Sequence, residues 1–363
     1  MISISRFSLV FLLAALLNSV ALASNENISP ETSSGLEAKE SGLATTAMVV
    51  AANPFASQVG LDILNAGGSA ADAAIAVQLM LNLVEPQSSG IGGGAFALWF
   101  DGEEQQLTTF DGRETAPMAA TAELFLKEDG EPLQFYDAVV GGRSVGTPGT
   151  LALLKRLHEN YGKLAWADLF EPTIRLAREG FPLSPRLHSL LEWDADRLSK
   201  DPMAGSLYFS NGVALPIGTP VKNPVFAETL ELIAKNGSDA FYSGQLADDI
   251  VKAVGNHPTN PGGLGLKDLA AYKVIERQPV CGIYRTKSIC GMGPPSSGGL
   301  TVAQILGMLE HFDLSEASLQ SFHLLAEASR LAFADRGLYM ADADFVPVPS
   351  EGLLDPEDLK QRA

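Results

Sequence analysis

The sequence contains little cysteine and little positive charge, and after its N-terminal segment it has no long apolar run. Its 363 residues include only two cysteines, which excludes a disulfide-built scaffold and a four-thiolate zinc site. Lysine and arginine total 25 against 43 aspartates and glutamates, so the net charge is −18. Because an acidic surface repels phosphate, this balance counts against nucleic-acid binding. A hydrophobic content of 46% is still enough for a large globular core.

The N-terminus has the pattern of a secretory signal peptide. Arg6 supplies positive charge, Phe7–Leu17 is almost wholly apolar, and an Ala-Leu-Ala cleavage site ends at Ala23. The apolar run is too short to span a bilayer comfortably. We therefore expect residues 1–23 to be removed and the rest to be exported, periplasmic or secreted, without membrane attachment. Residues 24–42 are polar and are predicted to be a disordered leader.

The N-terminal part of the ordered region predicts a strand and two helices. Residues 47–52 form a short apolar run typical of a buried strand. Asn53-Pro54 predicts a helix start, and the next glycine pair ends that helix. Ser69 and Asp72 resemble a capping box, which would begin an interior helix reaching Val84.

The remaining pattern predicts an α+β domain that occupies residues 43–363. Two apolar runs separated by a polar turn predict a hairpin, and helical periodicity continues afterwards with expected breaks at Gly162 and Pro172. No regular βαβ alternation is present, so helices layered on a largely antiparallel sheet are expected. The predicted strands are 95–100, 106–111 and 284–289, and the predicted helical segments are 150–178, 301–309 and 314–340.

Two glycine-rich segments invite functional interpretations that their context does not favour. Gly90–Gly94 nearly matches a dinucleotide fingerprint, but a helix precedes it and a strand follows, so a tight turn with a close backbone approach is expected. Pro294–Gly299 contains Ser296 and Ser297, yet no G-x-S-x-G motif and no recognisable histidine pattern accompany them. A rigid turn that caps a helix from about Thr301 is the preferred interpretation.

Arg113 is the candidate ligand-binding residue. It lies just beyond the second strand of the predicted hairpin, where a guanidinium can hold a carboxylate through two parallel hydrogen bonds. An ordinary ion pair with Asp111 or Glu114 is the alternative. Cys281 and Cys290 also leave two possibilities, a disulfide in an oxidising compartment or two buried thiols in neighbouring strands. No metal-ligand motif is present and no cofactor is expected.

Six segments, in order, resemble the γ-glutamyltranspeptidases, also called glutathione hydrolases. The resemblance runs from about Leu43 to the last residue. It implies an N-terminal-nucleophile hydrolase with an αββα sandwich, of which this chain supplies the large-subunit part. It also implies that Arg113 binds the α-carboxylate of a γ-glutamyl substrate. The segments are Ala56–Asp72 (ASQVGLDILNAGGSAAD), Gly90–Gly94, Asp111–Pro117, Gly141–Gly149, Pro294–Gly299 and Leu331–Leu354 (LAFADRGLYMADADFVPVPSEGLL).

The resemblance places the catalytic nucleophile outside this sequence. In the family a precursor cuts itself, and a threonine at the new N-terminus of the small subunit attacks the γ-glutamyl amide. No threonine occurs after Thr301, so the nucleophile is expected downstream of Ala363 and no catalytic residue is assigned in this chain. Thr45-Thr46 precedes an apolar run as a terminal nucleophile would, but the resemblance places that segment at the first strand of the large subunit.

The function implied is γ-glutamyl transfer and glutathione hydrolysis by a heterodimer, with amino acids or peptides as acceptors. This chain alone is expected to be inactive, and poorly soluble or molten, because its apolar faces would lack their partner. Two alternatives stay open: a non-catalytic relative that binds γ-glutamyl compounds, and a β-lactam side-chain acylase of the same superfamily.

Overall fold

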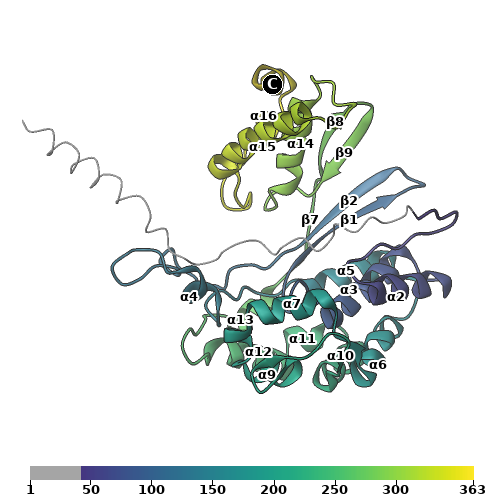
Figure 1. The fold of residues 1–363 in the computed structure, drawn as a ribbon, viewed down its shortest axis with the longest axis vertical. Coiled ribbons are helices and arrows are strands. Elements are labelled where there is room, and N and C mark those ends of the chain that lie inside the picture. The colour runs from purple at the N-terminus through teal and green to yellow at the C-terminus, as the bar shows by residue number, and fades with distance from the viewer. Residues whose placement is uncertain (1–41) are drawn as a thin grey trace, which may run out of the picture.

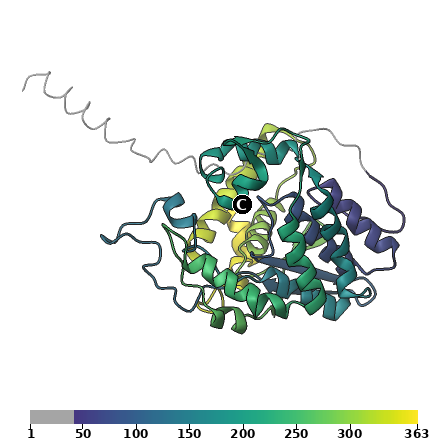
Figure 2. The ribbon, with the colours of Figure 1, turned by 90° about the horizontal axis from the view of Figure 1, so that it is seen from below.

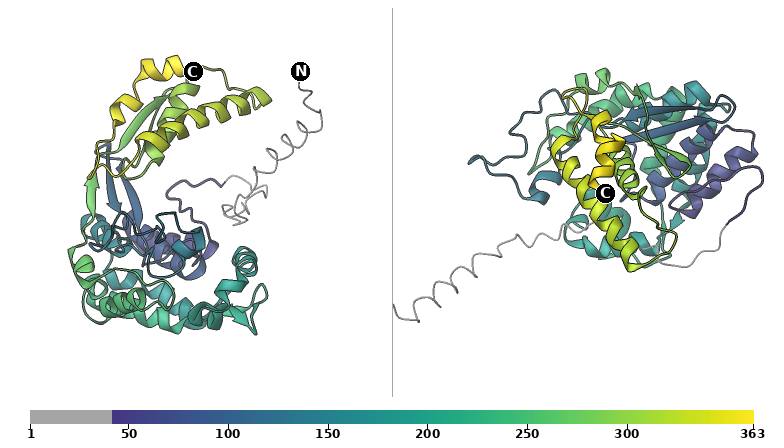
Figure 3. Two further views of the ribbon diagram at one scale, coloured as in Figure 1. Left: turned by 90° about the vertical axis from the view of Figure 1, so that its left-hand side faces the viewer. Right: turned by 90° about the horizontal axis from the view of Figure 1, so that it is seen from above.

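The computed structural model describes residues 42–363, which form a large N-terminal lobe and a smaller C-terminal lobe connected by strands (Figure 1). The N-terminal lobe comprises residues 42–274 and the C-terminal lobe residues 278–363. Seen from the side, the two lobes form an open C shape (Figure 3). The predicted signal peptide and all but the last residue of the predicted leader lie outside the described residues.

The first two helices begin as the sequence predicts. Helix α2 (Pro54–Asn65) starts where the Asn53 side chain accepts a hydrogen bond from the Phe55 N–H. Helix α3 (Ala70–Val84) starts at the predicted capping box. Most of its apolar side chains are buried, so its predicted interior position is also confirmed.

The predicted strand at residues 47–52 is wrong. The segment is irregular, and Met48 and Val50 are exposed. Hydrophobicity suggested a buried strand, but a strand also needs a hydrogen-bonding neighbour, and among residues 42–363 no strand pairs with this segment. Instead Val49 lies against Gly60 of α2, where an added Cβ would come within 2.7 Å of its side chain.

The predicted hairpin is confirmed and becomes two strands of an antiparallel sheet. Strands β1 (Ala95–Asp101) and β2 (Gln106–Gly112) pair, and β7 (Ile275–Arg277) adds to the other side of β2. One face packs on the N-terminal lobe, where Trp99 stacks on Tyr161 with ring centroids 4.1 Å apart. The opposite face carries Phe96, Leu98 and Phe100, and the last two are exposed.

Helices of the N-terminal lobe pack around α3. Gly162 ends α5 as predicted. The chain breaks again next to Pro172, because one short helix ends at Leu169 and α6 begins at Glu171, with Pro172 in the first turn, where its missing N–H costs nothing. The other elements are α4 (Phe135–Val139), α5 (Thr150–Tyr161), η1 (Trp166–Leu169), α6 (Glu171–Glu179), β3 (Phe181–Pro182), α7 (Pro185–Trp193), α8 (Ala195–Leu198), α9 (Pro202–Tyr208), β4 (Phe209–Ser210), β5 (Val213–Ala214), β6 (Pro220–Val221), α10 (Pro224–Asn236), α11 (Asp239–Tyr242), α12 (Gln245–Gly255) and α13 (Leu266–Ala271).

The C-terminal lobe is a hairpin packed against helices. The predicted strand at 284–289 overlaps the observed strand Lys287–Gly291 but begins too early, because the chain turns at Arg285, whose φ of 57° lies in the left-handed region. The helix predicted at 314–340 begins later, at the Ser318 N-cap. The elements are β8 (Val280–Tyr284), β9 (Lys287–Gly291), α14 (Gly298–Leu309), α15 (Leu319–Tyr339), α16 (Ser350–Leu353) and α17 (Pro356–Arg362).

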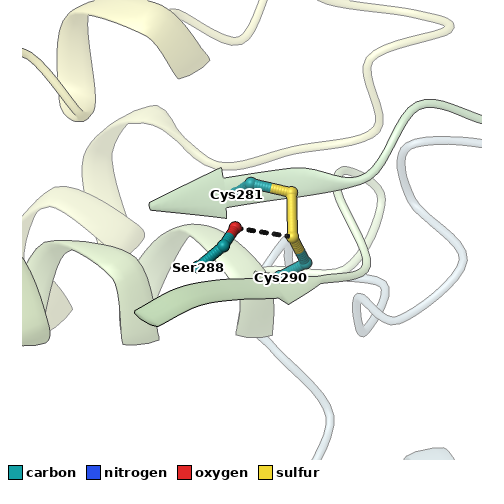
Figure 4. Close-up of a disulfide and its surroundings, with 3 residues drawn as sticks. All are labelled: Cys281, Ser288 and Cys290. Atoms are coloured by element: carbon teal, nitrogen blue, oxygen red, sulfur yellow. Dashed lines mark hydrogen bonds between the residues drawn. A yellow bond between two sulfur atoms is a disulfide. The ribbon is translucent and has the colours of Figure 1, made fainter. Parts of the chain in front are cut away.

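Cys281 and Cys290 form a disulfide across the β8–β9 hairpin (Figure 4). The two residues are direct partners in the antiparallel register. Ser288 approaches the bridge, with its Oγ 3.6 Å from the Cys290 Sγ. Of the two possibilities that the sequence leaves open, the structure therefore has the disulfide.

All strand pairs among the described residues are antiparallel, as the sequence predicts. Helices of the N-terminal lobe lie below the β1–β2 hairpin in Figure 1, and they face the viewer when the molecule is seen from below (Figure 2). None of the helices in residues 42–363 is both long and apolar enough to cross a membrane.

Candidate functional site

Arg113 lies where β2 ends, and its main chain is held on both sides. Its N–H donates to Asp111 Oδ1 at 2.9 Å, and its carbonyl accepts from the Tyr272 hydroxyl at 2.7 Å. The side chain is exposed, and its Nη1 donates to the Pro295 carbonyl at 3.3 Å. A fixed backbone with a solvent-facing guanidinium suits the binding of an anionic ligand.

The ion pair considered as the alternative for Arg113 is not formed. The other oxygen of Asp111 accepts from Arg277 Nε at 2.8 Å, so the carboxylate is already paired. Glu114 turns back onto the glycine-rich turn, where its carboxylate fills the space that a Cβ on Gly94 would need. Neither acidic neighbour forms a salt bridge with Arg113 in the described part of the chain.

The Gly90–Gly94 segment is the tight turn that its context predicts. Helix α3 precedes it and β1 follows it, and the Gly93 N–H donates to the Gly90 carbonyl at 3.2 Å. A Cβ on Gly94 would also lie 2.8 Å from the Arg113 Cα. Only glycine allows the turn to pass this close to the candidate site.

The proline–serine loop contacts Arg113 through the Pro295 carbonyl, and its two serines take part in local hydrogen bonds. Ser297 is the N-cap residue of α14, and its Oγ accepts from Arg336 Nε at 2.9 Å. Ser296 Oγ accepts from the Gly298 N–H at 3.2 Å. No hydrogen bond joins either serine to a histidine within residues 42–363. The helix that follows begins at Gly298, slightly before the predicted Thr301.

Tyr272 is a hydrogen-bond donor that remains protonated. Burial raises the pKa of its phenol, and the nearby carboxylates of Asp111 and Glu114 contribute to raising it. Its ring stacks on Tyr242, with centroids 6.0 Å apart, and burial raises the pKa of Tyr242 to about 12. Because the phenol stays neutral, its O–H remains available to donate the hydrogen bond to the Arg113 carbonyl.

Sequence reasoning missed Tyr272 and Arg277, and it singled out the loop of Pro295 without its contact to Arg113. Each lies more than 150 residues from its partner in the Arg113 region, since the separations are 159, 166 and 182. No local motif marks such contacts, which arise only when the chain folds.

Two further expectations concern catalytic and metal groups. Thr45 and Thr46 lie in an exposed bend, and the segment after them is not a strand, so they lack the setting of a terminal nucleophile. Within residues 42–363 no cluster of histidine, cysteine, aspartate and glutamate side chains has a metal-binding arrangement.

The sequence profile of the family described as Gamma-glutamyltranspeptidase matches residues 56–363. The chain belongs to this family. A glutathione hydrolase proenzyme of Bacillus subtilis (strain 168) is 38% identical to this family member over 329 residues, which are 90% of this chain and 55% of that protein. The chain thus spans about half the length of the curated relatives that it matches.

Solved structures of similar proteins confirm the fold class. The γ-glutamyltranspeptidase of Helicobacter pylori superposes with a TM-score of 0.84 at 34% identity, covering 89% of this chain and 92% of that chain. A cephalosporin acylase from Bacillus halodurans superposes with a TM-score of 0.74 at 31% identity, covering 90% of this chain and 62% of that chain. This γ-glutamyltranspeptidase family member therefore has the α+β fold of the large-subunit part of an N-terminal-nucleophile hydrolase.

Proposed function

We propose that this chain is the large-subunit part of an enzyme that hydrolyses glutathione and transfers γ-glutamyl groups. A small subunit led by threonine supplies the nucleophile. Its hydroxyl attacks the γ-glutamyl carbonyl, the amine leaves with a proton, and an ester links the acyl group to the threonine. Water then releases glutamate, or the amine of an amino acid or peptide takes the γ-glutamyl group. Supporting this proposal, the Bacillus subtilis relative is described as a glutathione hydrolase proenzyme.

In this enzyme Arg113 binds the α-carboxylate of the γ-glutamyl group. The observation that carries the assignment is its double main-chain anchoring beside an exposed guanidinium that forms no ion pair with a carboxylate of residues 42–363. A planar guanidinium offers two parallel N–H groups to a carboxylate, which fixes the orientation of the substrate as well as its position.

The small subunit covers apolar surface that this chain leaves open. On β1, Leu98 and Phe100 are exposed on the sheet face that points away from the N-terminal helices. On α15, Phe322 and Phe333 are exposed as well. Large apolar side chains exposed in this number are typical of an interface. It supports an assembly in which a second layer of structure packs on this sheet.

Replacing Arg113 with alanine tests the proposal. In the protein assembled with its small subunit, Arg113→Ala should raise KM for a γ-glutamyl anilide by about 10- to 100-fold, equivalent to about 1.5–3 kcal/mol of charged hydrogen bonding. A donor whose α-carboxylate is replaced by a carboxamide should be used equally by both proteins. An unchanged KM for the anilide would remove Arg113 from the binding site.

A β-lactam side-chain acylase is the second candidate, because the cephalosporin acylase of Bacillus halodurans superposes on 90% of this chain. Release of amine from a γ-glutamyl anilide and from a glutaryl amide separates the two functions. The glutaryl group lacks the α-amino group, so a γ-glutamyl enzyme should strongly prefer the anilide. A preference for the glutaryl amide would favour the acylase.

We also propose that the protein is exported and that residues 43–363 form its folded domain. Supporting export are the N-terminal signal pattern and the Cys281–Cys290 disulfide, since disulfides persist in oxidising compartments. N-terminal sequencing of the mature protein tests this, with cleavage after Ala23 as the expected result.

A further inference from the structure

The side chain of Arg277 lies at the junction of the two lobes and joins two carboxylates. Its Nε donates to Asp111 Oδ2 at 2.8 Å. Its Nη1 and Nη2 donate to the two oxygens of Asp344, at 2.9 and 2.6 Å. Asp111 belongs to β2, whereas Asp344 lies in the turn that follows α15 in the C-terminal lobe. One guanidinium therefore connects the sheet to the C-terminal lobe.

The strand that carries Arg277 is itself anchored. Arg277 is the register partner of Thr109 on β2, and its carbonyl accepts from the Thr109 hydroxyl at 2.6 Å. Its side chain is largely buried, with 14% exposed, and that of Asp111 is 7% exposed. The inner ion pair is thus shielded from solvent, while the outer partner Asp344 is 45% exposed.

Asp111 connects Arg277 to the main chain of Arg113. One of its oxygens is bound to Arg277, and the other accepts the Arg113 N–H. The carboxylate can rotate only by breaking one of these bonds. Without Arg277 it would be free to turn toward solvent or toward the nearby Arg113 side chain, which would occupy the guanidinium that the substrate needs.

We infer that Arg277 is a positioning residue for the substrate, acting on Arg113 through Asp111 and held in place by Asp344. The inference rests on the proposed function, in which Arg113 binds the α-carboxylate. It adds that the orientation of Arg113 depends on a contact with the C-terminal lobe, and that Arg277 keeps Asp111 from neutralising Arg113.

The test compares Arg277→Gln, Arg277→Lys and a matched control in the assembled protein. Arg178→Gln removes a 2.6 Å pair with Glu231 on the outer helices and should leave kinetics unchanged. Arg277→Gln should raise KM for a γ-glutamyl anilide about tenfold with little change in kcat. Arg277→Lys should recover part of the loss, because lysine keeps the charge without the planar fork.

A donor with an α-carboxamide separates positioning from general structural damage. It cannot use Arg113, so Arg277→Gln should leave its KM unchanged. Equal losses with both donors would overturn the inference. A double-mutant cycle gives a second criterion: in an Arg113→Ala background the effect of Arg277→Gln should disappear, and a full additional tenfold effect would also overturn it.

Two further measurements keep the test decisive. If Arg277→Gln does not fold, Asp344→Asn is used instead, because it removes the charge from the exposed partner of Arg277 and keeps the buried pair with Asp111. This variant should raise KM for the anilide about threefold. An unchanged KM for both donors would overturn the role of Asp344. If the assembled protein shows no turnover, the proposed function fails, but calorimetric titration with glutathione still compares the variants. Equal affinities in wild type and Arg277→Gln would then overturn the inference.

Discussion

At the residue scale, Asp72 shows how one buried carboxylate joins separate parts of the chain. Its side chain is fully buried, and Oδ2 accepts from the N–H groups of Ser69, Lys163 and Leu164 at 2.8, 2.9 and 3.2 Å. The start of α3 is thereby attached to the loop after α5. Burial acts to raise the pKa of Asp72, but these hydrogen bonds outweigh it and the pKa is lowered.

Asp72→Asn should therefore destabilise the assembled protein by about 1–3 kcal/mol at pH 7. Because the folded-state pKa lies below the unfolded value of about 3.9, ionised Asp72 stabilises the fold above that value. The contribution is lost as pH falls through the folded-state pKa. Urea unfolding between pH 7 and pH 2 should show a shallower acid decline for the variant. Asp62→Asn, on the exposed side of α2, is the control and should match wild type.

The same scale shows what local sequence predicts well. Ser69 and Asp72 are three residues apart, so their capping box could be read directly, and Asn53-Pro54 marked the start of α2 in the same way. The link from Asp72 to Lys163 was invisible because 91 residues separate the partners. Arg113 could be named as a candidate from its resemblance to a family motif, whereas the contacts of Tyr272 and Arg277 with its region became visible only through the fold.

At the element scale, the β8–β9 hairpin depends on its disulfide and on α14. Gly282 of β8 lies against Ala303 of α14, where an added Cβ would sit 3.4 Å from the Ala303 Cβ. The hairpin has few residues, and a short two-stranded element is marginal without such support. The strand predicted at 284–289 starts before the turn and matches β9 only from Lys287, because the sequence pattern does not reveal the reversal at Arg285.

Reduction of the Cys281–Cys290 bridge should lower the stability of the C-terminal lobe by about 2–3 kcal/mol, because the bridge closes a short loop in the unfolded chain. Thermal unfolding with and without a thiol reductant measures the effect. A variant with both cysteines changed to alanine should unfold like the reduced protein and should not respond to the reductant. Identical unfolding of oxidised and reduced wild type would contradict the prediction.

At the scale of the whole molecule, the two lobes form an open C shape (Figure 3), and many large apolar side chains of residues 42–363 are exposed. Helix α15 has 21 residues, yet its buried residues are only Ala328 and Ala332. Large side chains such as Phe322 and Leu338 face solvent. The wrong prediction of a strand at 47–52 also has its cause at this scale. Within residues 42–363 no strand pairs with this apolar segment, and the sequence alone does not show that.

Residues 43–363 expressed alone should therefore bind a hydrophobic dye strongly and associate at micromolar concentration. Dye fluorescence and light scattering, with and without the small subunit, measure this. A Phe322→Gln, Phe333→Gln double variant should reduce both signals. A monodisperse monomer that unfolds sharply and binds little dye would contradict the prediction.

The double anchoring of the Arg113 main chain has an entropic consequence. Hydrogen bonds to Asp111 and from Tyr272 hold the peptide units on either side before any ligand arrives. Association then restricts only the outer rotors of the guanidinium, a loss of about 0.5–1.5 kcal/mol for one long side chain. In the proposed role of Arg113, a small anion therefore need not order the backbone that binds it.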